Sequence, residues 1–153
     1  MYTRHEISEE EHLAWWSRTK QRADQLYFMY ENKNQPLGIV GLTAIDTANN
    51  NCSWAFYASP DAPRGTGSRM EYLAIEYVFG VLKLHKLYCE VLAFNSPVIK
   101  LHHKFGFVVE GIFRQHHHVG NKYTDIHRLG LLQSEWINKR AEMLNKLTSI
   151  HKY

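Results

Sequence analysis

The chain has 153 residues, 44% of them hydrophobic and 13% aromatic, which is enough apolar surface to bury a core of its own. Eighteen basic and fifteen acidic residues give a net charge of +3, which permits an anionic ligand, but no clustered Lys/Arg run indicates nucleic-acid binding. No apolar stretch approaches the roughly 18 residues that span a bilayer, and the first residues lack the layout of a signal peptide. We therefore expect one soluble, cytoplasmic domain over residues 1–153 that binds neither membrane nor nucleic acid.

The first half of the chain predicts one helix and three strands. Ser8 precedes three glutamates, as in a capping box, and predicts a helix to about Asp24. The predicted strands are 26–31, 37–47 with bulges at Gly38 and Gly41, and 52–58. Cys52 in the third strand, and Cys89 in a later one, are expected to be reduced buried thiols, as in a reducing compartment.

The second half continues the alternation of helices and strands. A helix is expected from the glycine-rich segment at 64–68 to about Lys83, with one apolar face formed by Met70, Leu73, Ala74, Tyr77, Val78 and Val81. The remaining expected elements are a strand at 87–93, a short helix at 96–104 closed by Gly106, a hairpin of 107–118 and 123–131 around Gly120-Asn121, and a terminal helix at 133–147. This order, without repeat or long linker, predicts a single α/β unit.

The segment Arg64-Gly65-Thr66-Gly67-Ser68 lies between a strand and a helix. A helix N-terminus presents free N–H groups and the positive end of its dipole, which together bind phosphate. The glycines let the backbone approach an anion closely, and Ser68 is expected to cap the helix. An ordinary turn is the alternative. The segment lacks the Gly-Lys-Ser/Thr of a P-loop, and Met70 replaces the third glycine of a dinucleotide fingerprint.

A second block of sequence supports a functional role for this segment. It consists of LYCEVLAFN at 87–95 and a following helix that ends in Lys104-Phe105-Gly106-Phe107. With both blocks in this order, the chain closely resembles the GCN5-related N-acetyltransferases (GNAT) over nearly its whole length. The family's pyrophosphate motif lies over Arg64–Arg69, although Arg69 stands where a Gly or Ala is usual. The resemblance implies an α/β GNAT fold with a mixed, mostly antiparallel sheet, a splayed parallel strand pair and helices on both faces.

The resemblance also implies acetyl-CoA as co-substrate, with its pantetheine arm between the splayed strands 52–58 and 87–93. The physics agrees, because splayed strands leave backbone groups unpaired until a ligand binds them. The cofactor-binding residues implied are Phe56, Tyr57, Arg64, Gly65, Thr66, Gly67, Ser68, Arg69, Val91, Leu92 and Asn95. Relatives carry a strand and a helix ahead of the segment that begins at Ser8. We therefore expect either a start further upstream or an open edge at strand 26–31.

Within the family the nearest similarity is to the acetyltransferases of pseudaminic acid synthesis, which acetylate the 4-amino group of a UDP-linked dideoxy sugar. The segments RGTGSRMEY at 64–72, LHKL at 84–87 and VLAFN at 91–95 carry it. Ribosomal-protein N-terminal acetyltransferases and spermidine acetyltransferases share the same overall motif order, and they are the alternatives. A non-catalytic acyl-CoA-binding module is a further alternative. The expected partner is a small amine, best a nucleotide sugar, because the positive charge suits a diphosphate better than a polyamine. A homodimer is left open.

Acyl transfer needs a base for the amine, an oxyanion donor and an acid for the leaving thiolate. Glu90, in mid-strand, is the first candidate base, although an ion pair at the strand edge explains it equally well. Asp46 is a weaker second candidate for the base, on the substrate side, because an Asp before a polar turn usually stabilises that turn. Trp54 is a candidate wall of the substrate pocket. Relatives place a Tyr acid in the short helix, and the matching position is His102, with His103 facing elsewhere.

The remaining histidine and tryptophan groups have simpler interpretations. His116 and His118 face one side of a strand and His117 the other, and no Cys or carboxylate set completes a metal site, so no metal is expected. Trp15, Trp16 and Trp136 are expected to belong to the core.

Overall fold

The structure, a computed structural model, describes residues 23–150. The helix expected from Ser8, with Trp15 and Trp16, lies outside them. Within the described residues no helix is both long and apolar enough to cross a bilayer.

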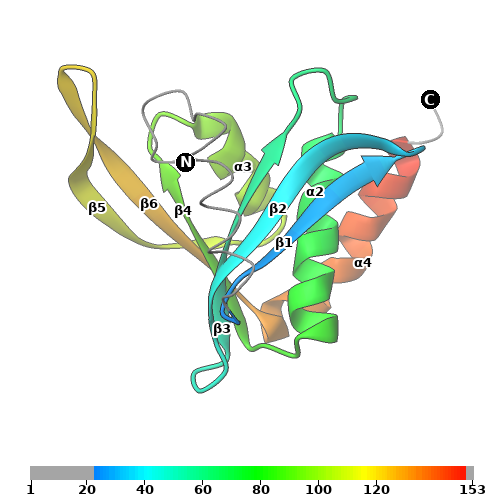
Figure 1. The fold of residues 1–153 in the computed structure, drawn as a ribbon. Helices are drawn as coiled ribbons and strands as arrows, with labels where there is room; N and C mark the ends of the chain where they lie inside the picture. Colours follow the sequence, from blue (N-terminus) through cyan, green and yellow to red (C-terminus); the bar gives the residue numbers. More distant parts are fainter. Residues whose placement is uncertain (1–22, 151–153) are drawn as a thin grey trace.

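The described residues form one central sheet of six strands, in the order β1-β2-β3-β4-β6-β5. The strands are β1 (Leu26–Asn32), β2 (Gln35–Asp46), β3 (Asn51–Ala58), β4 (Lys86–Leu92), β5 (Val108–Val119) and β6 (Lys122–Leu132). All neighbours pair antiparallel except β3 and β4, which are parallel. β1 lies at one edge of the described sheet, and the β5–β6 hairpin projects from the other (Figure 1). The expected mixed sheet with one parallel pair is confirmed.

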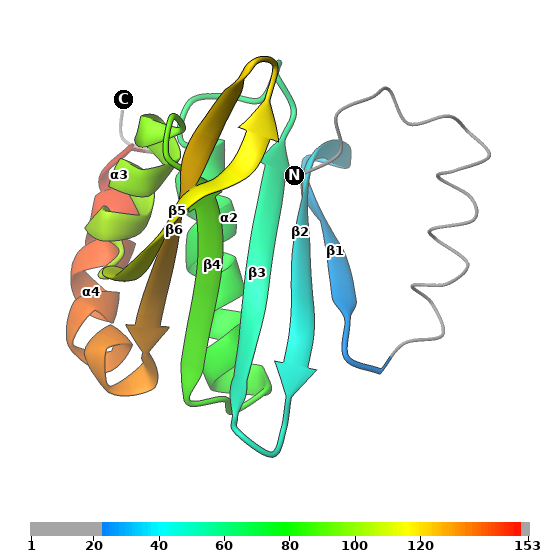
Figure 2. The same ribbon diagram turned by 90° about the vertical axis from the view of Figure 1, so that its left-hand side faces the viewer.

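The described helices pack on one face of this sheet (Figure 2). They are α2 (Thr66–Glu76), which continues as the π-helical turn η1 (Tyr77–Val81), α3 (Ser96–Lys104) and α4 (Gln133–Ile150). Every second residue of β4, namely Leu87, Cys89 and Val91, is buried against them, as the alternation of a strand requires. Gly106, with φ of 102°, ends α3 as expected. The helices and this face of the sheet share one continuous core.

Of the two bulges expected in β2, the structure has an irregularity beside Gly38, because Tyr30 pairs with Gly38 and Glu31 with Pro36, which leaves Leu37 as the extra residue. Gly41 pairs in regular register on both sides. Both glycines also provide room for neighbouring residues. A Cβ at Gly38 would lie 2.6 Å from Met70 Cε and from the Tyr57 carbonyl oxygen, and one at Gly41 would lie 2.8 Å from the Tyr27 ring. A second irregularity lies near the end of β2, between Thr43 and Asp46.

The buried face of α2 differs from the apolar face expected from sequence. Leu73 and Val81 are 53% and 63% exposed, whereas Glu71 and Ile75 are fully buried. The buried stripe is therefore rotated by about one residue, and it continues into a π-helical turn whose period differs from 3.6. This rotation brings a carboxylate into the core.

Candidate active site

A cleft opens between β3 and β4 because these two strands separate part of the way along their length. Their pairing stops after Asn51–Lys86, Cys52–Leu87 and Ser53–Tyr88. Beyond that point a cleft of about 280 Å³ lies between the strands, and α3 contributes to its wall. Its lining residues are Trp54, Ala55, Phe56, Tyr57, Ala58, Cys89, Glu90, Val91, Leu92, Asn95, Val98 and His102. The splayed pair expected from sequence is present.

The glycine-rich segment leads from the end of β3 into the start of α2. Gly65 precedes the helix with φ of 92°, a conformation that glycine adopts without strain. The Thr66 amide and hydroxyl both donate to the Pro63 carbonyl oxygen, at 3.1 and 2.6 Å. Within the described residues the amides of Gly67 and Ser68 have no partner, which leaves them open to an anion.

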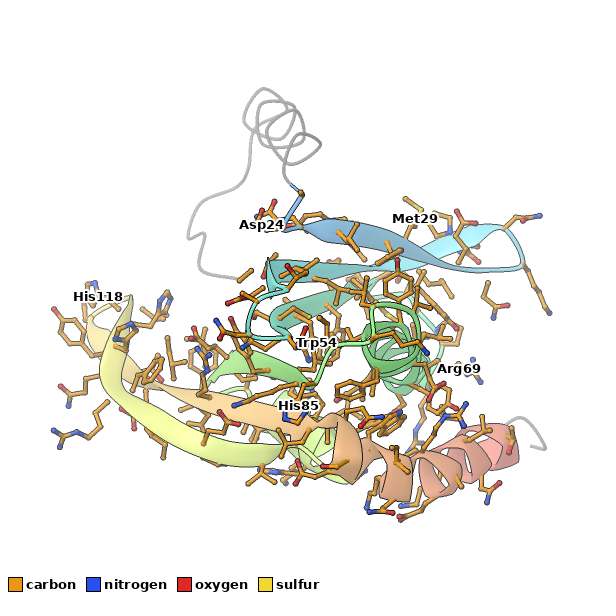
Figure 3. The ribbon with its side chains drawn as sticks, turned by 90° about the horizontal axis from the view of Figure 1, so that it is seen from below. Asp24, Met29, Trp54, Arg69, His85 and His118 are labelled. Atoms are coloured by element: carbon orange, nitrogen blue, oxygen red, sulfur yellow. The ribbon has the colours of Figure 1, made fainter. Side chains whose placement is uncertain are left out.

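Ser68 was expected to cap this helix, and that expectation is wrong. The helix begins two residues earlier, at Thr66, so Ser68 lies inside the first turn and no side chain caps it. The two arginines of the segment differ in position. Arg64 is exposed next to the loop, and Arg69 lies on the side of α2 away from Trp54 (Figure 3).

The floor of the cleft is aromatic. The Trp54 ring lies 5.4 Å from that of Phe56 and 5.3 Å from that of His102. Phe107 lies 5.3 Å from His102 and 6.3 Å from Trp54, so these rings form one cluster. Trp54 is only 2% exposed, so its indole belongs mainly to the core beneath the cleft. The neighbouring His103 is exposed and its Nδ1 lies 3.0 Å from the Phe107 carbonyl oxygen, so the two histidines of α3 face different surroundings, as expected.

His102 has a partner that the sequence analysis missed. Its Nδ1 lies 2.7 Å from Oε1 of Glu71 in α2, and the two residues are 2% and 0% exposed. Burial raises the pKa of the Glu71 carboxyl, and the hydrogen bond and charge of His102 oppose that shift. The signal available in the sequence was the position of Glu71 on α2, directly after the core residue Met70 and one turn before Ile75.

Glu90 projects from the opposite face of the sheet, because it alternates with the buried Cys89 and Val91 of β4. Arg128 Nη1 of β6 donates to Glu90 Oε1 at 3.0 Å, and the same guanidinium lies 3.9 Å from the centre of the Tyr88 ring. Glu90 thus lines the cleft with its carboxylate already balanced by a cation. The structure brings Glu90 and His102 to one cleft, on opposite faces of the sheet.

Asp46 is not part of this group. It accepts hydrogen bonds from the amides of Ala48 and Asn49 and from the Asn49 side chain in the β2–β3 turn. These bonds, led by that of the Asn49 side chain, lower the pKa of Asp46. The turn and the C-terminal end of β3 lie at opposite ends of the sheet (Figure 2), so Asp46 is distant from the cleft.

Neither the histidine run nor the cysteines form a metal site. Among residues 23–150 no group of three or more metal-ligating side chains occurs. His118 lies toward the end of the β5–β6 hairpin, away from Trp54 (Figure 3). Cys52 and Cys89 are free and buried as expected, and burial raises the pKa of Cys52 to about 12 and that of Cys89 further. Trp136, 2% exposed, belongs to the core, also as expected.

Comparisons with known proteins agree with this geometry. The model of the acetyltransferase (GNAT) domain matches residues 3–127. The chain is 25% identical over 118 residues to spermidine N(1)-acetyltransferase of Vibrio cholerae, covering 76% of this chain and 68% of that protein. It is 27% identical over 119 residues to acetyltransferase PseH of Campylobacter jejuni, covering 78% and 74%. Across curated relatives of these two kinds, the matched region spans 60% to 74% of the relative's own length.

Among solved structures, the spermidine N-acetyltransferase of Vibrio cholerae in complex with CoA and spermine superposes with a TM-score of 0.84 at 23% identity. The superposition covers 90% of this chain and 82% of that one. At this identity the likeness establishes a shared fold.

Proposed function

This chain belongs to the acetyltransferase (GNAT) family, whose members transfer the acetyl group of acetyl-CoA to an amine, and on that premise we propose that its acceptor is a primary amine on an anionic small molecule. The 4-amino group of a UDP-linked dideoxy sugar, as in pseudaminic acid synthesis, is the acceptor that fits best. The observation that supports this choice is the Glu90–Arg128 ion pair at the cleft, whose two charges balance each other.

The cleft suits acetyl-CoA as co-substrate, which supplies an acetyl thioester. Beyond Ser53 and Tyr88 the facing edges of β3 and β4 do not pair with each other, so they can bond an extended pantetheine chain as a further strand would. Phe56 and Tyr57 line one side and Val91, Leu92 and Asn95 the other. The open amides of Gly67 and Ser68 are placed for a pyrophosphate, with Arg64 exposed beside them.

The charges around the cleft favour an acceptor with an anionic carrier. A polyamine needs several unbalanced carboxylates, whereas the described lining contains one exposed carboxylate, Glu90, already paired with Arg128. An arginine stacked on Tyr88 suits a diphosphate or a nucleotide, because its guanidinium binds phosphate in a bidentate manner. Spermidine is the second candidate, since the Vibrio cholerae relative is a spermidine acetyltransferase.

In the proposed reaction the base and the acid lie on opposite faces of the sheet. A neutral amine attacks the thioester carbonyl carbon, the carbon–sulfur bond breaks, and the thiolate leaves with the bonding electrons. Glu90, on the face opposite the helices, takes the amine proton directly or through water. His102 protonates the departing sulfur from the helix face, and Trp54 holds the imidazole at the cleft floor. An amide of β3 at the splay stabilises the oxyanion.

A thiol-release assay tests the proposal. The full chain is assayed with acetyl-CoA and equal concentrations of a UDP-linked 4-amino sugar, spermidine, and a peptide with a free N-terminus. We expect kcat/KM for the sugar to exceed that for spermidine by about tenfold or more, the size of one favourable charge interaction. A higher kcat/KM for spermidine than for the sugar would make the polyamine the acceptor and contradict the proposed sugar. Thermal stabilisation by acetyl-CoA without turnover on any amine would indicate a non-catalytic module.

A further inference from the structure

We propose that Glu71 is a positioning residue that fixes the His102 ring, with Nδ1 toward α2 and Nε2 toward the cleft, and keeps Nε2 protonated. The inference rests on the proposed role of His102 as acid and extends it to a residue outside the cleft lining. Its basis is a contact between two helices, α2 and α3, that brings a buried carboxylate to a buried imidazole.

The hydrogen bond assigns the two ring nitrogens different tasks. Nδ1 of His102 lies 2.7 Å from Glu71 Oε1 and is therefore engaged with α2. The imidazole ring places Nε2 on its opposite side, and His102 is among the residues that line the cleft. The rings of Trp54, Phe56 and Phe107 lie 5.3 to 6.2 Å away and restrict rotation of the imidazole. The ring is thus held in one orientation.

The charge balance of the pair decides where its protons stay. With one proton between Oε1 and Nδ1 and a second on Nε2, the pair has no net charge. If Nε2 loses its proton, a net negative charge remains between side chains that are 0% and 2% exposed, and burying an unbalanced charge is costly. Glu71 therefore favours the form of the pair in which Nε2 carries a proton.

Among residues 23–150, the other groups packed on the pair do not supply a compensating cation. Trp54 and Phe56 approach from β3 and Phe107 from the segment after α3, and none of them titrates. The titratable neighbour on β4 is Cys89, whose pKa is raised by burial and then by the charge of Glu71, so it stays a neutral thiol. Within the described residues, Glu71 Oε2 has no hydrogen-bond partner, so the carboxylate depends on His102 for its balance.

The proposed step is a simple proton transfer. The departing thiolate takes the proton of His102 Nε2, which forms the S–H bond and leaves the pair with one net negative charge. That charge is removed when Nε2 takes a proton from water that enters the cleft after the thiol has left. Glu71 contacts no substrate atom in this scheme and acts through the ring orientation and its charge.

Nitrogen NMR of the full chain with ¹⁵N-labelled histidine tests the inference without requiring activity. The His102 signals are identified by their absence in His102→Phe. We expect Nε2 of the wild type to be protonated at pH 7, and Glu71→Gln to lose that proton at a pH lower by about one unit or more, as expected for removal of an opposite charge. Glu76→Gln, on the same helix but paired with Arg140, is the matched control and should titrate like the wild type.

An unprotonated Nε2 at pH 7 in the wild type overturns the inference, and this result does not depend on the stability of any variant. Identical His102 titration in the wild type and Glu71→Gln overturns it as well. Glu71 would then only hold α2 and α3 together.

Kinetics then separate this inference from the proposed acid. Glu71→Gln should lower kcat at pH 8 about tenfold or more, while the acetyl-CoA dissociation constant changes by less than about twofold. Adding Glu71→Gln to His102→Phe should cause no further loss, because Glu71 acts through His102. An additive loss overturns the inference. If His102→Phe alone retains full activity, the acid assignment fails, while the NMR titration still decides whether Glu71 controls the ring.

Discussion

Arg128 Nη1 donates to Glu90 Oε1 at 3.0 Å, and its guanidinium lies 3.9 Å from the centre of the Tyr88 ring. This one side chain both balances the carboxylate at the cleft and presents a planar cation on the open face of the sheet. Its removal therefore changes the charge that an incoming acceptor meets.

Arg128→Ala should reduce kcat/KM for a UDP-linked amino sugar by about tenfold or more, and leave that for spermidine unchanged or raised, because Glu90 loses its partner. Steady-state kinetics with both acceptors measure the difference. Lys86→Ala is the control, since Lys86 pairs with Glu110 at 2.7 Å rather than with Glu90. An equal loss for both acceptors would mean that Arg128 does not discriminate between them.

Gly67→Val should weaken acetyl-CoA binding by about tenfold or more, because the side chain obstructs the approach of a phosphate to the open amides. The fold should tolerate it, since the atoms nearest to a Cβ at Gly67 would belong to the Leu101 and Phe56 side chains, at an ordinary contact distance of 3.6 Å. Isothermal titration calorimetry and thermal unfolding measure the two quantities. Unchanged affinity in the folded variant would remove the loop from cofactor binding.

Gly65→Ala is the contrasting variant. With φ of 92°, Gly65 has a backbone conformation that an alanine adopts only with strain, so this change should cost about 1 kcal/mol or more of unfolding free energy. Equal stability of the two variants in chemical denaturation would contradict the distinction between the glycines.

Hydrogen exchange should detect the splay. Amides of β3 and β4 that face the gap beyond Ser53 and Tyr88 have no partner strand within residues 23–150, so they should exchange rapidly in the free protein and become protected when acetyl-CoA binds. Amides in the paired segment, 51–53 with 86–88, should change little. Equal protection with and without acetyl-CoA would place the pantetheine arm elsewhere.

Glu76 should make stability depend on pH in the acid range. Burial alone would raise the pKa of Glu76, but hydrogen bonds from Arg140 and Trp136 and the charge of Arg140 outweigh it and lower the pKa below its usual 4.5. A carboxyl with a lowered folded-state pKa stabilises the protein above about pH 4.5, and the contribution disappears as the pH falls through the lower value. Glu76→Gln should therefore lower the unfolding free energy at pH 7 and lower it less at pH 3, as measured by urea denaturation. An equal loss of unfolding free energy at pH 7 and pH 3 would show that ionisation of Glu76 does not contribute to stability.

The sequence predicted the elements that strong local patterns determine. Alternation located β3 and β4, the Gly120-Asn121 turn located the hairpin, and the family motifs located the splay. The position at which β3 and β4 stop pairing, and hence the cleft, depends on contacts between distant segments. Only the family resemblance made it predictable.

Glu71 escaped prediction because a glutamate in a helix is usually exposed, and its burial follows from the rotation of α2 against the sheet. Similarly, Gly38 and Gly41 were interpreted only as bulges, although both positions are also restricted to glycine because Met70, Tyr57 and Tyr27 occupy the adjacent space. Such close contacts between separate elements leave no periodic signal along the chain.

The rate of thiol release by His102→Phe on the best amine acceptor tests whether His102 is the general acid. We expect kcat to fall by about 10²-fold or more, the usual size of a lost general acid, with acetyl-CoA affinity little changed. His102→Tyr should recover part of the rate and move the alkaline limit of activity upward, because a phenol retains its proton to higher pH. His103→Phe, at the exposed neighbour, should turn over like the wild type. A kcat for folded His102→Phe equal to that of the wild type would show that His102 is not the acid, and His102 would then serve only to join α3 to α2 through Glu71.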